Sequence, residues 1–252
     1  QCSKGVILNK YLFESDYSAD SLRWIRKREE LKILNDPFSK KNSENIPELD
    51  ALQNEIIKAN DSALSYFFAM EFPYKTYKMQ KVILDNKDAK YAFLFAQNIR
   101  NCDIKALQRL VIDSKKTKYI CKFGCFVKNA DRKPLESVVI KSRNVKYAHM
   151  WLKHVKEASV DKFKDVIISS KKPRYLFELA KHLTQPEDIC MIEDLIIQSK
   201  SFTYMRLLAE KIKSSNIEKL EQAVLDSDNV NEIKKFAKYV RRSKMKKFFL
   251  VL

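Results

Sequence analysis

A basic residue stands directly before an aromatic one at regular intervals in the middle of this chain. Each precedes a tyrosine, and the set consists of Lys90, Lys118, Lys146 and Arg174. Lysine and arginine neutralise phosphate groups, and a tyrosine ring gives an unpaired base a surface on which to stack. These residue types in this order indicate binding of a polyanion, with candidate stacking platforms at Tyr119, Tyr147 and Tyr175.

Further cations lie in the loops beside this ladder. The three central loops hold Lys115, Lys116, Lys141, Arg143, Lys171 and Lys172. Asp113 is the only acid in these loops. The repeat described below places each ladder residue in the first turn of a helix, where an exposed cation opposes the helix dipole by about 0.3–1 kcal/mol. Helix stability therefore does not explain the ladder. Together the cations predict a basic ridge along one edge, with repeat units about 10 Å apart.

A second interpretation of the same residues gives them no function. A lysine-rich edge can simply be solvated, with the tyrosine rings packed mostly inward and only their hydroxyls at the surface. The ladder also ends within the array, because Thr203 and Asn231 take the place of its cations and Asp226 and Asp228 make the last loop acidic. The sequence leaves both interpretations open.

The elements that must position these residues belong to a tandem repeat. Segments such as KYAFLFAQNI, KYICKFGCFV and RYLFELAKHL have equivalent positions at residues 91, 119, 147, 175, 204 and 232, a period of 28 with a single 29. In each segment a bulky residue follows at +4 and an aliphatic one at +8, which places them on one helical stripe. A second apolar pattern in each unit predicts a second helix, for example at Ile104, Leu107, Leu110 and Val111.

Capping residues support these helix boundaries, because a short oxygen-bearing side chain satisfies free backbone N–H groups at a helix start. The first helices are expected at residues 88–100, 116–128, 144–156, 172–184, 201–213 and 229–241. The residues expected to cap first helices are Asp61, Asp88, Asn144, Ser201 and Asn229. Those expected to cap second helices are Asp103, Asp131, Ser159, Asp188 and Asn216. Stacked two-helix units predict an all-α fold, an α-solenoid, in which neighbouring units bury one another's apolar faces.

The repeat also predicts the domain organisation. About six full units and degenerate units at both ends assign residues 46–252 to one solenoid domain. Residues 1–45 do not repeat, and we expect them to form a helical cap or adaptor with a polar linker, because the open core at a solenoid end needs a cover. The apolar end MKKFFLVL predicts either a cover from the first residues of another chain or truncation of a longer array, and Gln1 instead of Met likewise suggests processing or truncation.

Patterns for catalysis and metal binding are weak. The chain has 2 glycines, so it lacks a phosphate-cradling loop, and no serine or cysteine nucleophile has a base at recognisable spacing. Cys121 and Cys125 are close in sequence and His149 occupies the repeat position of Cys121, but a second Cys/His pair for zinc is missing. We therefore expect no enzyme activity, no metal and no cofactor.

The overall composition agrees with a polyanionic partner. The 252 residues include 49 Lys and Arg against 32 Asp and Glu, a formal net charge of +17. The 5 cysteines are odd in number, lack paired spacing and come without a secretory signal, which predicts a reducing intracellular compartment. No apolar run reaches the length of a membrane span.

Units such as KYAFLFAQNIRNCDIKALQRLVIDSK resemble short helical repeat arrays encoded by giant DNA viruses, such as mimiviruses, and by some phages. The resemblance covers roughly residues 60–252. It implies a solenoid in a viral context, located in the host cytoplasm or the virion, and it transfers no catalytic residues. HEAT and tetratricopeptide arrays are similar in kind, but their period is longer and the tetratricopeptide Trp-Leu-Gly-Tyr pattern is missing here.

The sequence therefore predicts a non-enzymatic binding scaffold. The leading ligand is a polyanion, preferably RNA or single-stranded nucleic acid, within a viral nucleoprotein or a translation-related complex. The alternative is a protein–protein adaptor whose concave face takes a partner peptide or domain.

Overall fold

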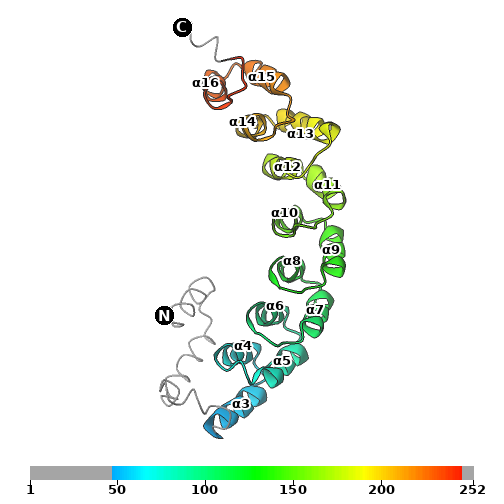
Figure 1. Ribbon diagram of the computed structural model, residues 1–252, viewed down its shortest axis with the longest axis vertical. Coiled ribbons are helices and arrows are strands. Elements are labelled where there is room, and N and C mark those ends of the chain that lie inside the picture. Colours follow the sequence, from blue (N-terminus) through cyan, green and yellow to red (C-terminus); the bar gives the residue numbers. More distant parts are fainter. Residues whose placement is uncertain (1–46, 246–252) are drawn as a thin grey trace. The chain divides into compact units, whose positions relative to one another are not determined.

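The computed structural model describes residues 47–245, which form two compact units, residues 47–131 and 132–245. All regular elements in this part of the chain are helices (Figure 1). The first unit contains α3 (Pro47–Ala59), α4 (Ser62–Glu71), α5 (Thr76–Asp85), α6 (Ala89–Asn98), α7 (Ile104–Asp113) and α8 (Thr117–Phe126). The expected N-terminal cap at residues 1–45 lies outside the described residues.

The second unit continues the same alternation of short helices. It contains α9 (Arg132–Lys141), α10 (Val145–His154), α11 (Val160–Ser169), α12 (Pro173–Ala180), α13 (Pro186–Gln198), α14 (Phe202–Lys211), α15 (Ile217–Leu225) and α16 (Val230–Tyr239). The even-numbered helices from α4 to α16 are the predicted first helices, and the odd-numbered ones are the second helices. The predicted α-solenoid architecture is confirmed.

Within each unit the helices form two rows. In the first unit α4, α6 and α8 contact one another in order, and α3, α5 and α7 do the same alongside them. In the second unit α10, α12, α14 and α16 make one row, and the odd-numbered helices pack against them. Each helix therefore buries its apolar stripe against its own partner and against the next repeat, as expected of a solenoid.

The buried side chains are those that the repeat pattern predicts. At the +4 position every residue is at most 1% exposed, and this set is Phe95, Phe123, Trp151, Leu179, Leu208 and Phe236. The next position in each repeat is also buried, at Ala96, Gly124, Leu152, Ala180, Ala209 and Ala237. Trp151 is fully enclosed, so its indole belongs to the core. The core face was therefore assigned correctly from spacing alone.

Two helix boundaries differ from the prediction. Helix α12 ends at Ala180 rather than near residue 184, and α13 begins at Pro186, so Asp188 lies inside a helix and is not its cap. Proline favours the first helical position because its missing N–H needs no partner there, and Pro186 therefore sets the start of α13. Ser159 and Ser201 do occupy capping positions, but neither side chain makes a capping hydrogen bond.

The repeats are also joined by a polar contact that sequence reasoning missed. Gln80 on α5 is 6% exposed, and its side-chain carbonyl accepts the Asp103 backbone N–H at 2.9 Å while its amide donates to the Asp103 carbonyl at 3.2 Å. Asp103 is the N-cap of α7. One buried glutamine thus bonds to the residue at which the second helix of the next repeat begins. We call this contact the inter-repeat clasp.

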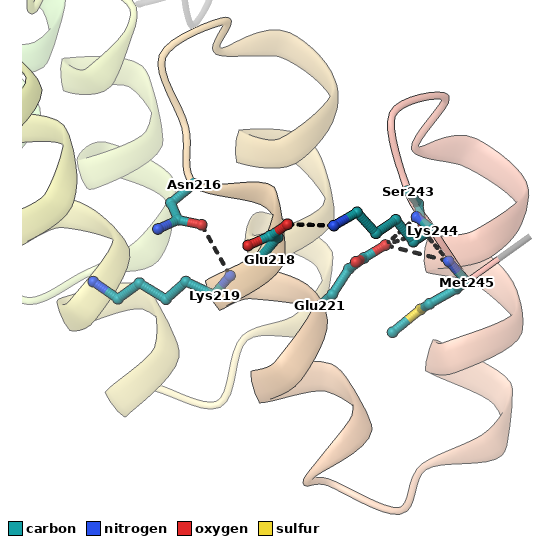
Figure 2. A network of polar contacts seen from close by, with 7 residues as sticks. All are labelled: Asn216, Glu218, Lys219, Glu221, Ser243, Lys244 and Met245. Carbon is teal, nitrogen blue, oxygen red and sulfur yellow. Dashed lines mark hydrogen bonds and ion pairs between the residues drawn. The ribbon is translucent and has the colours of Figure 1, made fainter.

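The clasp recurs with the period of the array. Gln108 bonds both backbone groups of Asp131 at 2.9 Å, and in the second unit a glutamate takes the place of the glutamine at all but one of the equivalent positions. Glu193 accepts the Asn216 N–H at 2.7 Å. Figure 2 shows Glu221 pointing at the backbone N–H groups of Lys244 and Met245, which lie at 2.7 and 3.4 Å. The equivalent positions in the array are Gln53, Gln80, Gln108, Glu136, Lys164, Glu193 and Glu221.

Candidate polyanion interface

The predicted basic ridge lies in the turns that connect a second helix to the next first helix. The turn after α9 shows how these segments are built. The Ser142 hydroxyl donates to the Val139 carbonyl at 2.6 Å and accepts the Asn144 N–H at 3.3 Å. Between them Arg143 adopts a left-handed backbone with φ of 49°. The same serine bonds occur at Ser114, Ser170 and Ser227.

The four ladder cations occupy equivalent positions in four helices. Each is the second residue of its helix, and they are Lys90 in α6, Lys118 in α8, Lys146 in α10 and Arg174 in α12. The predicted placement in the first turn is therefore correct. Lys90 and Lys118 belong to the first unit, where α6 contacts α8, and Lys146 and Arg174 to the second, where α10 contacts α12.

The loop cations lie in or beside the same turns. Lys115 and Lys116 connect α7 to α8, Lys141 ends α9, and Lys171 and Lys172 connect α11 to α12. With Arg143 and the ladder they make ten candidate cations, and every one of their side chains is exposed. The first unit thus brings four of them together, and the second unit six.

None of these ten cations forms an ion pair with an acidic side chain of the described residues. Several lysines outside this set do form ion pairs with acidic side chains. Lys219 lies 2.8 Å from Asp194, and Lys235 lies 2.7 Å from Glu232. The charge of the candidate cations is therefore not neutralised within the described chain, and it remains available to an external anion.

The turns at the opposite edge have a different charge balance. They connect a first helix to its second helix, and in three of them a cation is followed by an acid. Arg100 is near Asp103, Lys128 near Asp131 and Lys156 next to Glu157 in sequence. In these three turns the charges balance, whereas the turns after α7, α9 and α11 carry cations alone.

The candidate stacking tyrosines are only half exposed. Tyr119, Tyr147 and Tyr175 are all of intermediate burial. The Lys118 Nζ lies 5.5 Å from the centroid of the Tyr119 ring, and the His149 and Tyr175 rings lie 5.3 Å apart. These rings already have neighbours in the folded chain, which favours the phosphate backbone over the bases as the principal contact. Their use as stacking platforms stays a prediction.

His149 adds no positive charge to this surface at neutral pH. Burial lowers the pKa of its imidazole, and Arg174 and Lys153 act in the same direction. Glu178, 3.9 Å away, raises the pKa less than burial lowers it. The imidazole is consequently neutral at pH 7, and the charge of this region comes from lysine and arginine alone.

The thiols of α8 lie next to each other on one helix. The Cys121 and Cys125 sulfurs lie 4.0 Å apart. A hydrogen bond with Cys125, together with burial, raises the pKa of the Cys121 thiol. The described residues contain no group of three or more side chains arranged to hold a metal ion.

The structure adds two cations that the sequence reasoning left out. Lys87 and Lys200 occupy the same turn position as Lys115, Arg143 and Lys171, with φ of 52° and 53°, and both are exposed. Their spacing from the other turn cations follows the repeat period. That period was the signal that could have identified them.

Comparison with protein-family models, with curated proteins and with solved structures finds no match for this chain. The fold and the charged edge thus define its class, an α-solenoid with a cationic turn edge. Among the described residues no helix combines the length and the apolar character needed to traverse a bilayer.

Proposed function

We propose that this chain is a binding scaffold whose cationic turn edge holds a polyanion, with single-stranded nucleic acid as the ligand of choice. The observation that carries the proposal is the set of ten exposed turn-edge cations without an ion-pair partner in the described chain. Lysine and arginine on a nucleic acid release condensed counterions, so such a surface gains affinity that falls steeply with salt. The proposal assigns the chain a role in binding and not in catalysis.

The arrangement suits a linear ligand better than a compact one. The cations recur once or more per repeat, and each unit presents them from successive turns of one row rather than around a pocket. A phosphate chain offers negative charge at regular intervals, whereas a protein partner would offer a mixed surface. The scarcity of freely exposed rings at this edge favours recognition of the backbone over recognition of sequence.

The test reverses three ladder charges. Lys118→Glu, Lys146→Glu and Arg174→Glu together should leave the fold intact, because acids are favourable in the first turn of a helix. Binding of a fluorescein-labelled oligouridylate of about 20 nucleotides should fall on the order of 100-fold near 100 mM salt, and the slope of log K against log salt should shrink by about 2. Fluorescence anisotropy across a salt series measures both quantities.

A matched control separates local from overall charge. Lys128→Glu, Lys156→Glu and Lys213→Glu change the net charge equally, and these exposed residues lie in turns at the opposite edge. This variant should lose much less affinity. Equal losses in the two triple variants would show that net charge alone attracts the oligonucleotide. A wild-type chain without salt-dependent binding would overturn the proposal and favour the protein adaptor.

A further inference from the structure

We propose that the left-handed residue of each turn leading into a first helix is a ligand-contacting position, which adds Lys87 and Lys200 to the interface. This inference rests on the proposed function, because it names further residues of the same site. It starts from the backbone. Five such turns carry a basic residue with positive φ: Lys87 at 52°, Lys115 at 56°, Arg143 at 49°, Lys171 at 50° and Lys200 at 53°.

A basic residue is a poor choice for this position on grounds of stability. In the left-handed region the Cβ atom crowds the backbone, so glycine is favoured at the end of a helix, and asparagine or aspartate is next best. Lysine and arginine have neither the missing Cβ nor a short side chain that bonds locally. Five successive turns therefore use a residue type that the backbone conformation disfavours.

The same chain uses the expected residue at comparable positions elsewhere. In the turns from a first to a second helix, the left-handed residues are Asn101 and Asn129, with φ of 58° and 64°. At the two ends of the array the turn that leads into a first helix carries Asn60 and Asp228. A general excess of lysine in the chain would affect both kinds of turn. Among the described residues, basic residues with positive φ are instead confined to the central turns that lead into a first helix.

Hydrogen bonds fix the backbone of the turn around the basic residue. In the turn after α11, the Ser170 hydroxyl donates to the Ile167 carbonyl at 2.7 Å and accepts the Lys172 N–H at 3.3 Å, which encloses Lys171. The five side chains are exposed and form no ion pair within the described part of the chain. Fixing the backbone in advance lowers the entropy that ligand binding must remove.

The experiment tests whether the same substitutions raise the stability of the chain and lower its affinity for the ligand. Lys115→Gly, Arg143→Gly and Lys171→Gly combined should raise the Tm by about 2 °C per substitution, because glycine relieves the left-handed strain. The same variant should bind a labelled oligouridylate on the order of 10-fold more weakly near 100 mM salt, with a salt slope smaller by about 2. Lys87→Gly with Lys200→Gly should show the same two changes with smaller losses.

Two further variants keep the outcome interpretable. Asn101→Gly with Asn129→Gly makes the same backbone change at the other edge, so it should raise the Tm and leave affinity unaltered. Replacing Lys115, Arg143 and Lys171 with asparagine removes charge without adding glycine flexibility, and affinity should fall as in the glycine variant.

Each alternative result overturns a particular step. Glycine variants that keep wild-type affinity, while the Lys118, Lys146 and Arg174 reversal loses it, would overturn this inference and leave the proposed function standing. A fall in Tm in the glycine variants would show that the basic residues stabilise their turns, and it would also overturn the inference. A wild-type chain that binds no oligonucleotide would overturn the proposed function itself.

Discussion

Replacing Gln80 with methionine tests whether the inter-repeat clasp stabilises the array. Methionine has a similar volume and also fits an irregular buried site, so Gln80→Met removes hydrogen bonds without opening a large cavity. The side chain is 6% exposed and makes both of its clasp bonds to the Asp103 backbone, at 2.9 and 3.2 Å. The substitution leaves that N–H and that carbonyl without their protein partner.

The expected loss in the free energy of unfolding follows from the two hydrogen bonds. Each contributes about 1 kcal/mol net, and a fully buried orphan group would cost about 1–3 kcal/mol more. Asp103 itself is exposed, so water can reach its backbone and the additional penalty is small. We therefore expect a loss of about 2 kcal/mol, which corresponds to a fall in Tm of about 4–8 °C for a domain of this size.

Thermal unfolding followed by far-ultraviolet circular dichroism measures the effect. Gln97→Met is the matched control, because Gln97 is exposed on the neighbouring helix α6, and its Tm should stay within about 1 °C of wild type. Gln80→Glu keeps the acceptor and loses the donor, so its Tm should lie between those of the wild type and Gln80→Met. A Gln80→Met variant as stable as the control would refute the stabilising role of the clasp.

Two other substitutions test the second unit and the core. Burial raises the pKa of Glu193 above its usual value of 4.5, so the stability it contributes is present below pH 4.5 and is lost as the pH rises through the folded-state pKa. Glu193→Gln should therefore raise the Tm at neutral pH and flatten the fall in Tm above pH 4.5, which thermal scans across pH would show. Ala96→Arg or Ala180→Arg places a charge in a site at most 7% exposed and should cost about 3 kcal/mol or more; an unchanged Tm in either would mean that the core face is misassigned.

The repeat period was sufficient to predict most of the fold. A bulky residue at +4 recurs in every unit, and a small one follows it at +5 in all of them except at Leu152, a spacing typical of a buried helical stripe. The boundary error at α12 and α13 has a local cause. Asp188 looked like a cap because the repeat places one there, but Pro186 starts the helix earlier than the period indicates.

The clasp could not be recognised from the sequence in the same way. Its residue changes from glutamine at Gln80 to lysine at Lys164 and glutamate at Glu221, and each of these types is normally read as part of a solvated helix face. Only the fold shows that the position faces the next repeat. Lys164 still makes an inter-repeat contact, because its ammonium group pairs with Asp188.

The candidate interface was predicted in part. The exposure and helix positions of cations such as Lys118 and Lys146 followed from the repeat. Their lack of ion-pair partners in the described chain did not, because it depends on where neighbouring acids point. The left-handed conformation of Lys87 and Lys200 was also hidden, since a sequence signals positive φ mainly through glycine or asparagine.

Within each unit the two kinds of turn are held mainly by different means, and this difference bears on function. Turns into the second helices are held from a neighbouring repeat, as when Glu193 accepts the Asn216 N–H. Turns such as the one around Arg143 are closed by their own serine and backbone bonds. The turn before α6 is an exception, because the Asn86 amide also donates to the Asn60 carbonyl of the preceding turn at 2.7 Å. Turns closed in this way can therefore change their cationic side chains with little effect on the packing of repeats. Stability then depends on the clasp and the core, while the other edge is free to carry charges that the backbone conformation disfavours.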